Sequence, residues 1–287
     1  MKTSSRNRDG RRPGRVEGFM FDLDGTLVLS DRSLNGYQVL SGAIALLGEL
    51  NKRRIPFVVL TNGTNYPPRE QASKLRALGL PVSDDALLTP SSVAADLMPR
   101  RGVKRTLVLG TPGVGRALEE AGIRTVFTDD PGADRVDAVY IGWHPDCRMQ
   151  DIERAAKAIW NGAELYVASD VPFFATAGGK AMGYSYAISA AVRRITRAPM
   201  ILTGKPSLHA LRFVAKRLQI PMSRVGVVGD DPLVDVIMAR RGGAVGFGVT
   251  TGIAKARDWA GQPPAKRPHR VLRRLGELLD APGLSNL

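Results

Sequence analysis

The hydrophobic positions of the chain form short apolar runs that alternate with longer segments of helical periodicity. The first run, residues 18–21, ends in polar residues, and apolar positions with helical spacing follow at 42–53. A second apolar run covers 55–60, and a second helical pattern covers 67–79, with two prolines at its start and a glycine at its end. This alternation of strand and helix predicts a parallel sheet with helices on both faces.

The same alternation continues through the rest of the chain. We expect further strands in seven apolar runs, at 107–109, 125–127, 137–141, 165–167, 200–202, 225–228 and 243–249. Helical spacing predicts helices in five segments, at 113–121, 149–161, 181–195, 207–218 and 233–241. Residues 28–40 follow neither pattern, so we expect an irregular segment there. The predicted fold class is therefore α/β.

Two carboxylates stand where the first predicted strand ends. Asp22 and Asp24 are two residues apart, and alternate residues of a strand share one face, so the two side chains project together. Carboxylates this close repel each other and stay ionised only beside a cation or strong hydrogen-bond donors. A hard cation such as Mg²⁺, which prefers oxygen ligands, would satisfy them. Thr61 ends the second strand, and ligands of parallel sheets bind at such ends.

Four short motifs carry a resemblance to a known family. They are Asp22-Leu23-Asp24-Gly25-Thr26, Leu60-Thr61-Asn62-Gly63-Thr64, Gly204-Lys205-Pro206, and Gly229-Asp230-Asp231 followed by Asp235. In this order they resemble motifs I to IV of the haloacid dehalogenase (HAD) superfamily of phosphohydrolases. Each follows or lies beside a predicted strand, and the resemblance covers about residues 16–280.

The length of chain between the second and third motifs indicates a subfamily. It resembles subfamily IIA, the NagD-like or p-nitrophenyl-phosphatase-like group, in which a large α/β cap is inserted into the core. The resemblance implies a Rossmann-like core domain formed by 16–89 and 200–287, with an inserted α/β cap domain at 90–199. In this subfamily the cap often mediates dimers, so the resemblance allows a homodimer through the cap, while the sequence itself leaves the oligomeric state open.

The resemblance also implies a reaction and its catalytic residues. Asp22 is expected to attack phosphorus and form an aspartyl phosphate, while Asp24 protonates the leaving alkoxide and later deprotonates the attacking water. Lys205 supplies a fixed positive charge beside the phosphoryl oxygens. The expected function is a Mg²⁺-dependent phosphatase for a small phosphorylated metabolite of the sugar phosphate, nucleotide or glycerol phosphate class.

The remaining site residues hold the metal and the substrate. The resemblance implies Mg²⁺ ligands from Asp22, from the backbone carbonyl of Asp24, from Asp230, and from Asp235 or Asp231, directly or through water. Substrate-binding residues are expected in the phosphate loop and in the cap. We list Thr61, Asn62, Gly63 and Asp170, with Phe173, Phe174, Trp143 and His144 as further cap candidates.

This sequence departs from the family pattern in two places. Asp231-Pro232 stands where Arg or Asn more often follows the first Asp of motif IV, which leaves the role of Asp231 open. Residues 168–172 replace a Thr-Asn-x-Asp-like string, which leaves the identity of the substrate open. Because Asp24 is present, the chemistry of a dehalogenase is disfavoured.

The composition of the chain indicates where the protein is located and suggests an alternative function. The 287 residues carry a net charge of +14, a single cysteine (Cys147) and no apolar run near the length of about 20 residues that a membrane span needs. A cytoplasmic protein without membrane contact is expected. Basic residues gather in 1–15, predicted to be a disordered tail, and in 266–274, predicted to be the solvated face of a last helix. A phosphotransferase, or a basic nucleic-acid-associated protein on an inactive scaffold, remains the alternative.

Overall fold

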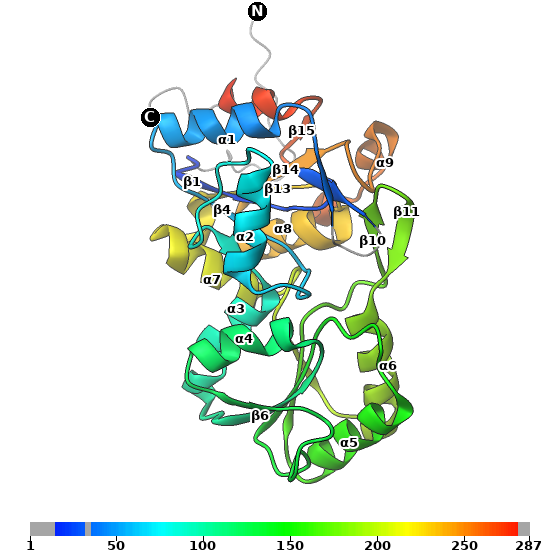
Figure 1. The fold of residues 1–287 in the computed structure, drawn as a ribbon. Coiled ribbons are helices and arrows are strands. Elements are labelled where there is room, and N and C mark those ends of the chain that lie inside the picture. Colours follow the sequence, from blue (N-terminus) through cyan, green and yellow to red (C-terminus); the bar gives the residue numbers. More distant parts are fainter. Residues whose placement is uncertain (1–14, 32–35, 281–287) are drawn as a thin grey trace, which may run out of the picture.

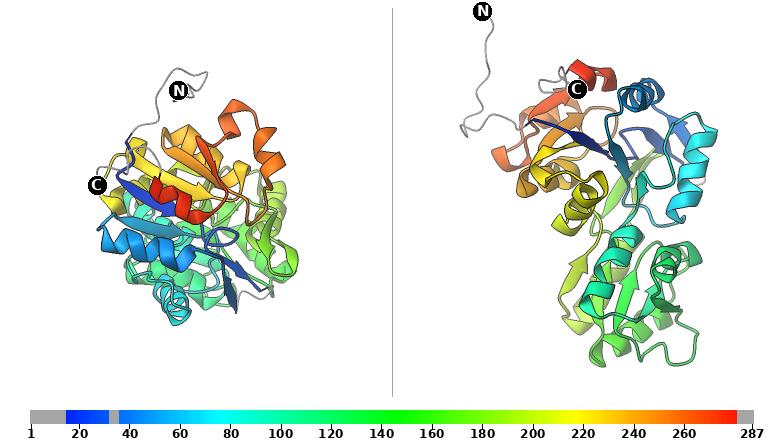
Figure 2. Two further views of the ribbon diagram at one scale, coloured as in Figure 1. Left: turned by 90° about the horizontal axis from the view of Figure 1, so that it is seen from above. Right: turned by 90° about the vertical axis from the view of Figure 1, so that its left-hand side faces the viewer.

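The computed structural model describes residues 15–31 and 36–280. They form two lobes, and the chain passes from the first lobe into the second and then returns (Figure 1). The side view in Figure 2 shows the lobes as separate bodies that meet along one junction. The basic segment 1–15 lies outside the described residues apart from Arg15. None of the helices within the described ranges has the length and hydrophobicity that a membrane crossing requires.

The first lobe is built on a six-stranded parallel sheet with the order β15-β14-β13-β1-β4-β5. Its strands are β1 (Gly18–Phe21), β4 (Phe57–Leu60), β5 (Leu87–Leu88), β13 (Val225–Gly229), β14 (Val245–Val249) and β15 (Arg270–Leu272). β1 lies between β4 and β13 and is fully buried, as its continuous apolar run predicts for a central parallel strand. This arrangement confirms the predicted α/β fold with a Rossmann-like core.

Helices cover both faces of this sheet. Consecutive residues of β1 point to opposite sides and are all apolar, so both faces of the sheet must be buried. Phe19 and Phe21 pack on one side with α1 (Ala43–Lys52) and α2 (Pro68–Ala77). Met20 packs on the other side, in a cluster formed with two further helices. These are α7 (Leu208–Leu218) and α8 (Ile237–Gly242). A short helix, α9 (Ala256–Ala260), and a final 3-10 segment, Leu275–Asp280, complete this lobe.

The second lobe is built on a five-stranded parallel sheet with the order β12-β9-β8-β6-β7. The strands are β6 (Arg105–Leu109), β7 (Arg124–Val126), β8 (Ala138–Ile141), β9 (Glu164–Val167) and β12 (Met200–Leu202). The helices α5 (Met149–Trp160) and α6 (Tyr184–Thr196) pack on one face. The other face packs against α3 (Pro90–Leu97) and α4 (Pro112–Glu120). We propose that this lobe is the inserted cap domain.

The structure differs from the sequence-based expectation at the predicted boundary of the cap. Met200–Leu202, which we assigned to the core, pairs with β9 and belongs to the second sheet. Three apolar residues carry no pattern that says which sheet they join, so only pairing decides. We therefore propose that the boundary lies after Leu202.

Two expectations about local structure are wrong. The segment 28–40, expected to be irregular, contains an antiparallel hairpin of β2 (Val28–Ser30) and β3 (Tyr37–Val39). The basic cluster 266–274 does not lie on a helix, because it contains β15, which pairs with β14 at the edge of the sheet. Each strand has only three residues, which is too short for periodicity to distinguish a strand from a loop.

A second hairpin was not predicted at all. The strands β10 (Phe173–Thr176) and β11 (Gly179–Met182) pair antiparallel and extend from the second lobe towards the first (Figure 1). The backbone N–H of Ala177, in the turn of this hairpin, donates to the carbonyl of Ser30 at 2.8 Å. The hairpin thus joins the cap lobe to β2, beside the end of β1.

Candidate active site

The end of β1 places the first two predicted residues. The Asp22 backbone N–H donates to the carbonyl of Val228 at 2.8 Å, which ties the strand end to β13. The Asp22 carboxylate in turn accepts the N–H of Leu23 at 2.7 Å. Gly25 then turns the chain with a φ of 84°, and a Cβ at this position would lie 2.7 Å from the carboxyl carbon of Asp230. Only glycine therefore allows the turn after β1 to approach Asp230.

Three buried carboxylates meet at this edge of the sheet. A potential ligand oxygen of each of Asp22, Asp230 and Asp235 lies within 4.8 Å of the others. Their side chains come from the ends of β1 and β13 and from the π-helical turn Pro232–Val236 that follows β13. The structure thus brings together residues more than 200 positions apart, as expected if the carboxyl ends of parallel strands form one site.

Lys205 is the cation that faces this cluster. It follows β12, its residue is 2 % exposed, and its ammonium group donates to Asp22 Oδ1 and, at 2.9 Å, to Asp235 Oδ1. Burial alone would lower the pKa of Lys205, but the charges of Asp22 and Asp235 outweigh it and hold the pKa above its ordinary value. Lys205 is therefore charged, and one positive charge faces three carboxylates.

The surplus negative charge makes the cluster suitable for a metal ion. Burial, together with the neighbouring carboxylates, raises the pKa of Asp230 well above its ordinary value. Burial likewise raises the pKa of Asp235 to about 7, against the opposing effect of Lys205. Carboxylates that are this costly to ionise are stabilised by a cation in their midst. The all-oxygen donor set of Asp22, Asp230 and Asp235 fits a hard ion such as Mg²⁺.

Asp24 lies apart from this cluster and has a different partner. Its Oδ1 accepts a hydrogen bond from the Ser30 hydroxyl, and its residue lines the same cavity as Asp22. Burial raises the pKa of Asp24 to about 7, with Ser30 acting in the opposite direction and Asp22 adding to the increase. A carboxyl group with a pKa near neutrality can both donate and accept a proton at physiological pH.

The loop after β4 holds the predicted phosphate-binding residues. Thr61 is 2 % exposed, and its hydroxyl accepts the N–H of Gly63 at 2.9 Å. The Asn62 side chain pairs with the backbone of Lys205: its Oδ1 accepts the Lys205 N–H at 2.8 Å, and its Nδ2 donates to the Lys205 carbonyl at 2.9 Å. Asn62 thereby fixes the segment that carries the ammonium group, a role that the sequence analysis did not assign to its side chain.

Asp231, whose role the sequence left open, has two functions in the structure. Its Oδ1 accepts the N–H of Leu233 at 2.7 Å and so caps the turn that presents Asp235. Its side chain also lines the cavity. It is not part of the group of three close carboxylates. The geometry therefore favours Asp235 over Asp231 as the residue near a metal.

The cavity at this site is shared by the two lobes. Trp143, Phe173 and Phe174, which we expected to contact the substrate, line it together with the buried carboxylates described above. Asp170 and His144 are not among the lining residues, so the structure does not bring them to the site. Tyr184 and Ser185 do line the cavity, and sequence reasoning missed them because they look like the ordinary first turn of α6.

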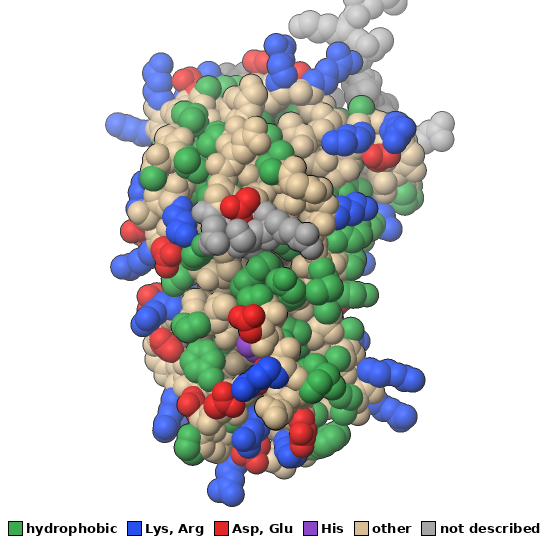
Figure 3. Space-filling view, turned by 45° about the vertical axis from the view of Figure 1, so that its right-hand side comes forward, with side chains coloured by type: hydrophobic (Ala, Val, Ile, Leu, Met, Phe, Trp, Pro, Cys, Tyr) green, Lys and Arg blue, Asp and Glu red, His purple; other side chains and the backbone are tan. Residues whose placement is uncertain are grey.

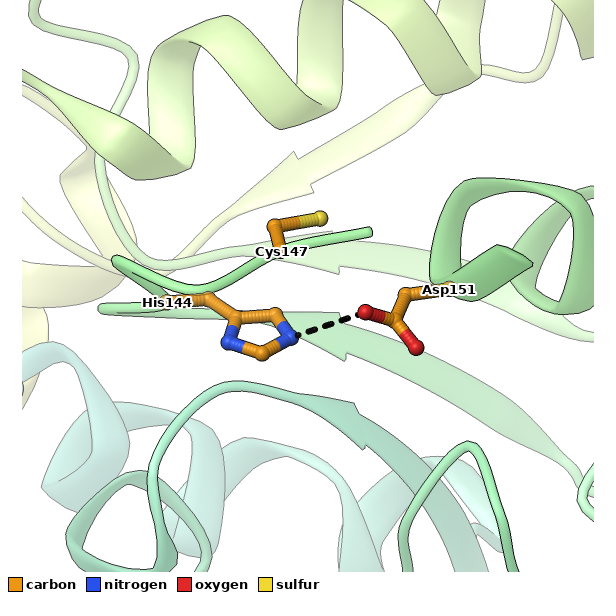
Figure 4. Close-up of side chains that lie close together, drawn as sticks. All are labelled: His144, Cys147 and Asp151. Carbon is orange, nitrogen blue, oxygen red and sulfur yellow. Dashed lines mark ion pairs between the residues drawn. The ribbon is translucent and has the colours of Figure 1, made fainter. Parts of the chain in front are cut away.

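His144 belongs to a second cluster, with Cys147 and Asp151 (Figure 4). His144 Nε2 lies 3.5 Å from Asp151 Oδ2, but both carboxylate oxygens already accept closer hydrogen bonds. Arg148 donates its backbone N–H to Oδ2 at 2.7 Å, and the Thr128 hydroxyl donates to Oδ1 at 2.7 Å. Burial raises the pKa of the Cys147 thiol to about 11, which keeps it protonated. Asp151 therefore fixes the start of α5 through these hydrogen bonds.

Family models match most of the first lobe and part of the second. Residues 19–124 match the model described as haloacid dehalogenase-like hydrolase. Residues 202–278 match a model described as HAD-hydrolase-like. The two matched segments contain every residue of the four motifs, from Asp22 to Asp235. The motifs themselves lie on either side of the proposed cap.

Individual proteins of known structure or activity resemble the chain over most of its length. An acid sugar phosphatase of Staphylococcus saprophyticus is 26% identical over 75% of this chain and 78% of its own length. The crystal structure of 4-nitrophenylphosphatase from Thermotoga maritima is 26% identical, with a TM-score of 0.81 over 93% of this chain and 97% of its own. Glycerol phosphate phosphatase from Mycobacterium tuberculosis, in complex with magnesium, is 27% identical, with a TM-score of 0.80 over 92% of this chain and 76% of its own.

Proposed function

Since the chain belongs to the haloacid dehalogenase-like hydrolases, we propose that it is a Mg²⁺-dependent phosphatase that works through an aspartyl phosphate. It is a phosphatase of small phosphorylated compounds, as its relatives are named. The observation that carries the mechanism is the convergence of Asp22, Lys205 and Asp235 at one buried point, with Asp230 beside them.

In the first half of the proposed reaction, an Asp22 oxygen attacks phosphorus. The bond from Asp22 oxygen to phosphorus forms as the bond from phosphorus to the ester oxygen breaks, and that oxygen takes the proton of Asp24. The alcohol leaves, and the phosphoryl group stays on Asp22. Asp24 is suited to this donation because burial raises its pKa to about 7.

In the second half, water attacks the phosphoryl group on Asp22. Asp24, now ionised, takes a proton from the water, the bond between Asp22 and phosphorus breaks, and inorganic phosphate is released. Lys205 stays next to Asp22 throughout and offsets charge on the phosphoryl oxygens. Thr61 and the loop after β4 line the same cavity, and the Thr61 hydroxyl and the backbone N–H groups of that loop are the further donors that we assign to the phosphoryl oxygens.

Asp22, Asp230 and Asp235 would hold the metal, with the backbone carbonyl of Asp24 as the further ligand that the resemblance implies. When bound, Mg²⁺ neutralises phosphoryl oxygens and allows an anionic nucleophile to approach an anionic substrate. The magnesium complex of the mycobacterial relative supports this choice of ion.

Asp22→Asn tests the proposal. The variant keeps the shape of the side chain but lacks the nucleophile, so we expect phosphate release from p-nitrophenyl phosphate with Mg²⁺ to fall by at least about a thousandfold. The control is Asp85→Asn, on the surface of the same lobe, where the side chain is 87 % exposed. Equal activity of the two variants would contradict Asp22 as the nucleophile.

A further inference from the structure

The cavity above the catalytic carboxylates has a sharp division of charge. The space within it that no protein atom fills is about 750 Å³, a figure that includes open solvent at its mouth. Every charged side chain that lines it among the described residues comes from the core lobe: Lys205 and the five aspartates named above. The cap lobe contributes only uncharged side chains, chiefly the rings of Trp143, Phe173, Phe174 and Tyr184. The part of the substrate that faces the cap thus meets an uncharged, aromatic surface.

Three of these rings form one continuous wall. Trp143 lies edge-on to Tyr184, with ring centroids 4.6 Å apart and planes at 72°. Trp143 also lies edge-on to Phe174, with centroids 6.3 Å apart and planes at 64°. Each residue is only partly buried. In Figure 3 hydrophobic side chains gather at the junction of the two lobes. We call Trp143, Phe174 and Tyr184 the aromatic wall.

Hydrogen bonds between the two lobes fix the position of the aromatic wall relative to the phosphate end of the cavity. The Trp143 backbone N–H donates to the hydroxyl of Thr64 at 2.9 Å, and Thr64 ends the loop that begins with Thr61. A second bond joins the lobes nearby, from Asn62 Nδ2 to the Ser169 hydroxyl at 3.3 Å. A substrate with its phosphate at Asp22 therefore has its leaving group directed between the catalytic loop and the wall.

The charges around the cavity disfavour a second anionic group on the substrate. Asp231 lines the cavity in addition to the catalytic carboxylates, and the ammonium group of Lys205 is already paired with two of them. The nearby Lys180 is exposed, and its ammonium group lies 4.0 Å from the Phe173 ring centroid, without lining the cavity. A second anion would face carboxylates and lose hydration, and the lining side chains that the structure describes offer no free cation to replace it.

We propose that the substrate is a phosphomonoester whose alcohol carries a planar aromatic ring and no second anionic group. The aromatic wall is the ring-binding surface, since ring faces and edges attract at the spacings seen here. The inference rests on the proposed phosphatase function and narrows it. Two kinds of compound share the required chemistry. In nucleoside monophosphates the ring lies beyond a ribose, and in arylmethyl phosphates it lies one carbon from the ester oxygen.

Matched pairs of substrates isolate the contribution of the ring. Uridine 5′-monophosphate and ribose 5-phosphate share a phosphate on a primary ribose carbon and differ in the base. Benzyl phosphate and cyclohexylmethyl phosphate differ in the planarity of the ring. We expect kcat/KM to be about tenfold higher or more for the aromatic member of at least one pair. Which pair responds shows whether the ring lies near to or far from the phosphate.

A third pair tests the charge. Glycerol 3-phosphate and 3-phosphoglycerate have the same three-carbon length, but the second carries a carboxylate. We expect kcat/KM to be about tenfold lower or more for 3-phosphoglycerate, because no described cap side chain offers it a cation. An equal or higher value would overturn the part of the inference that excludes a second anion.

Variants connect the preference to the wall. In Trp143→Leu and in Phe174→Leu the ratio of kcat/KM within the responding pair should fall towards one, because the ring contact is lost while the backbone bond to Thr64 remains. The matched control is Trp160→Leu on α5, which is 62% exposed and is not among the lining residues, and it should keep both the ratio and the rate. Because Trp143→Leu and Phe174→Leu test the same contact, the test still works if one of the two variants fails to fold.

The outcomes separate this inference from the function on which it rests. Equal kcat/KM within both ring pairs for the unaltered protein would overturn the inference and leave the phosphatase intact. A preference that survives in both wall variants would overturn the assignment to Trp143 and Phe174. If no compound, p-nitrophenyl phosphate included, releases phosphate with Mg²⁺ present, the proposed function and this inference both fall.

Discussion

The Ser30 hydroxyl donates a hydrogen bond to Oδ1 of Asp24, and the backbone carbonyl of Ser30 accepts one from the N–H of Ala177 in the cap hairpin. Ser30 is fully buried at the end of β2, so its side chain is fixed. The bond fixes the orientation of the Asp24 carboxyl group, and Asp24 lines the same cavity as Asp22. Ser30 thus positions the proposed acid, and the β10–β11 hairpin in turn contacts Ser30.

Ser30→Ala should therefore impair the hydrolysis of poor leaving groups selectively. An alkyl phosphate needs protonation of its leaving oxygen, and we expect its kcat to fall about tenfold or more. A p-nitrophenolate leaves with little help, so its kcat should change by no more than about twofold. Steady-state kinetics with glycerol 3-phosphate and p-nitrophenyl phosphate checks this. An equal loss for both substrates would indicate general disruption and contradict a positioning role.

Lys205→Met should destabilise the protein as well as inactivate it. Removing the cation leaves the buried carboxylates of Asp22 and Asp235 without their counter-ion, which costs about 3 kcal/mol or more. The matched control is Lys216→Met: its ammonium group pairs with Asp96 at 2.6 Å, but its side chain is 62 % exposed. That variant should lose less than about 1 kcal/mol. Urea unfolding in EDTA measures both, and similar losses would contradict the buried charge cluster.

The sequence predicts the core of the site because a single geometric rule governs it. Asp22, Thr61 and Asp230 each follow an apolar run, and the carboxyl ends of neighbouring parallel strands meet at one edge. That rule brings together residues far apart in the chain without any knowledge of the loops. Lys205 follows β12, which lies in the other sheet, and it enters the site through its bonds with Asn62.

The cap could not be predicted to the same depth. We expected Asp170 to bind the substrate, yet its neighbours Ser169 and Val171 line the cavity instead. Asp170 lies in an irregular segment just before β10, and the direction of its side chain depends on how β10 pairs with β11. The sequence of these strands has no alternating pattern that would predict this pairing. Tyr184 offered no signal either, since an aromatic residue at the start of a helix is usually a packing residue.

Removal of the metal should abolish activity and lower stability. EDTA should stop hydrolysis of p-nitrophenyl phosphate, and excess Mg²⁺ should restore it. At a Mg²⁺ concentration of about 100 times its Kd, binding to the folded state contributes about 2.7 kcal/mol, which raises the Tm. Asp230→Asn should remove this Mg²⁺-dependent rise in Tm, because a carboxylate of the cluster is lost.

The control for this experiment is Asp258→Asn, a partly exposed carboxylate near the start of α9. It should show the same Mg²⁺-dependent rise in Tm as the unaltered protein. If Asp230→Asn also kept the full rise, the metal would bind elsewhere, and the proposed ligand set would be wrong.

Asp151 should make the cap sensitive to acid. Burial raises its pKa, but hydrogen bonds from Arg148 and Thr128 outweigh burial and lower the pKa to about 2. Asp129, which shares Arg148, and His144, at 3.5 Å, also face this group. A carboxyl whose pKa is lower in the folded state stabilises the protein above its unfolded pKa. That contribution is lost as the pH falls from about 4 to about 2.

Asp151→Asn cannot titrate, so the variant should be about 1 kcal/mol less stable at pH 7 and lose less further stability between pH 4 and pH 2. The control is Asp146→Asn, an exposed residue of the same loop, which should follow the unaltered protein at every pH. Urea unfolding at a series of pH values, in the presence of EDTA, measures the difference. Parallel pH curves for Asp151→Asn and the unaltered protein would show that the carboxylate of Asp151 is not the acid-sensitive group, and the start of α5 would then owe its stability to packing alone.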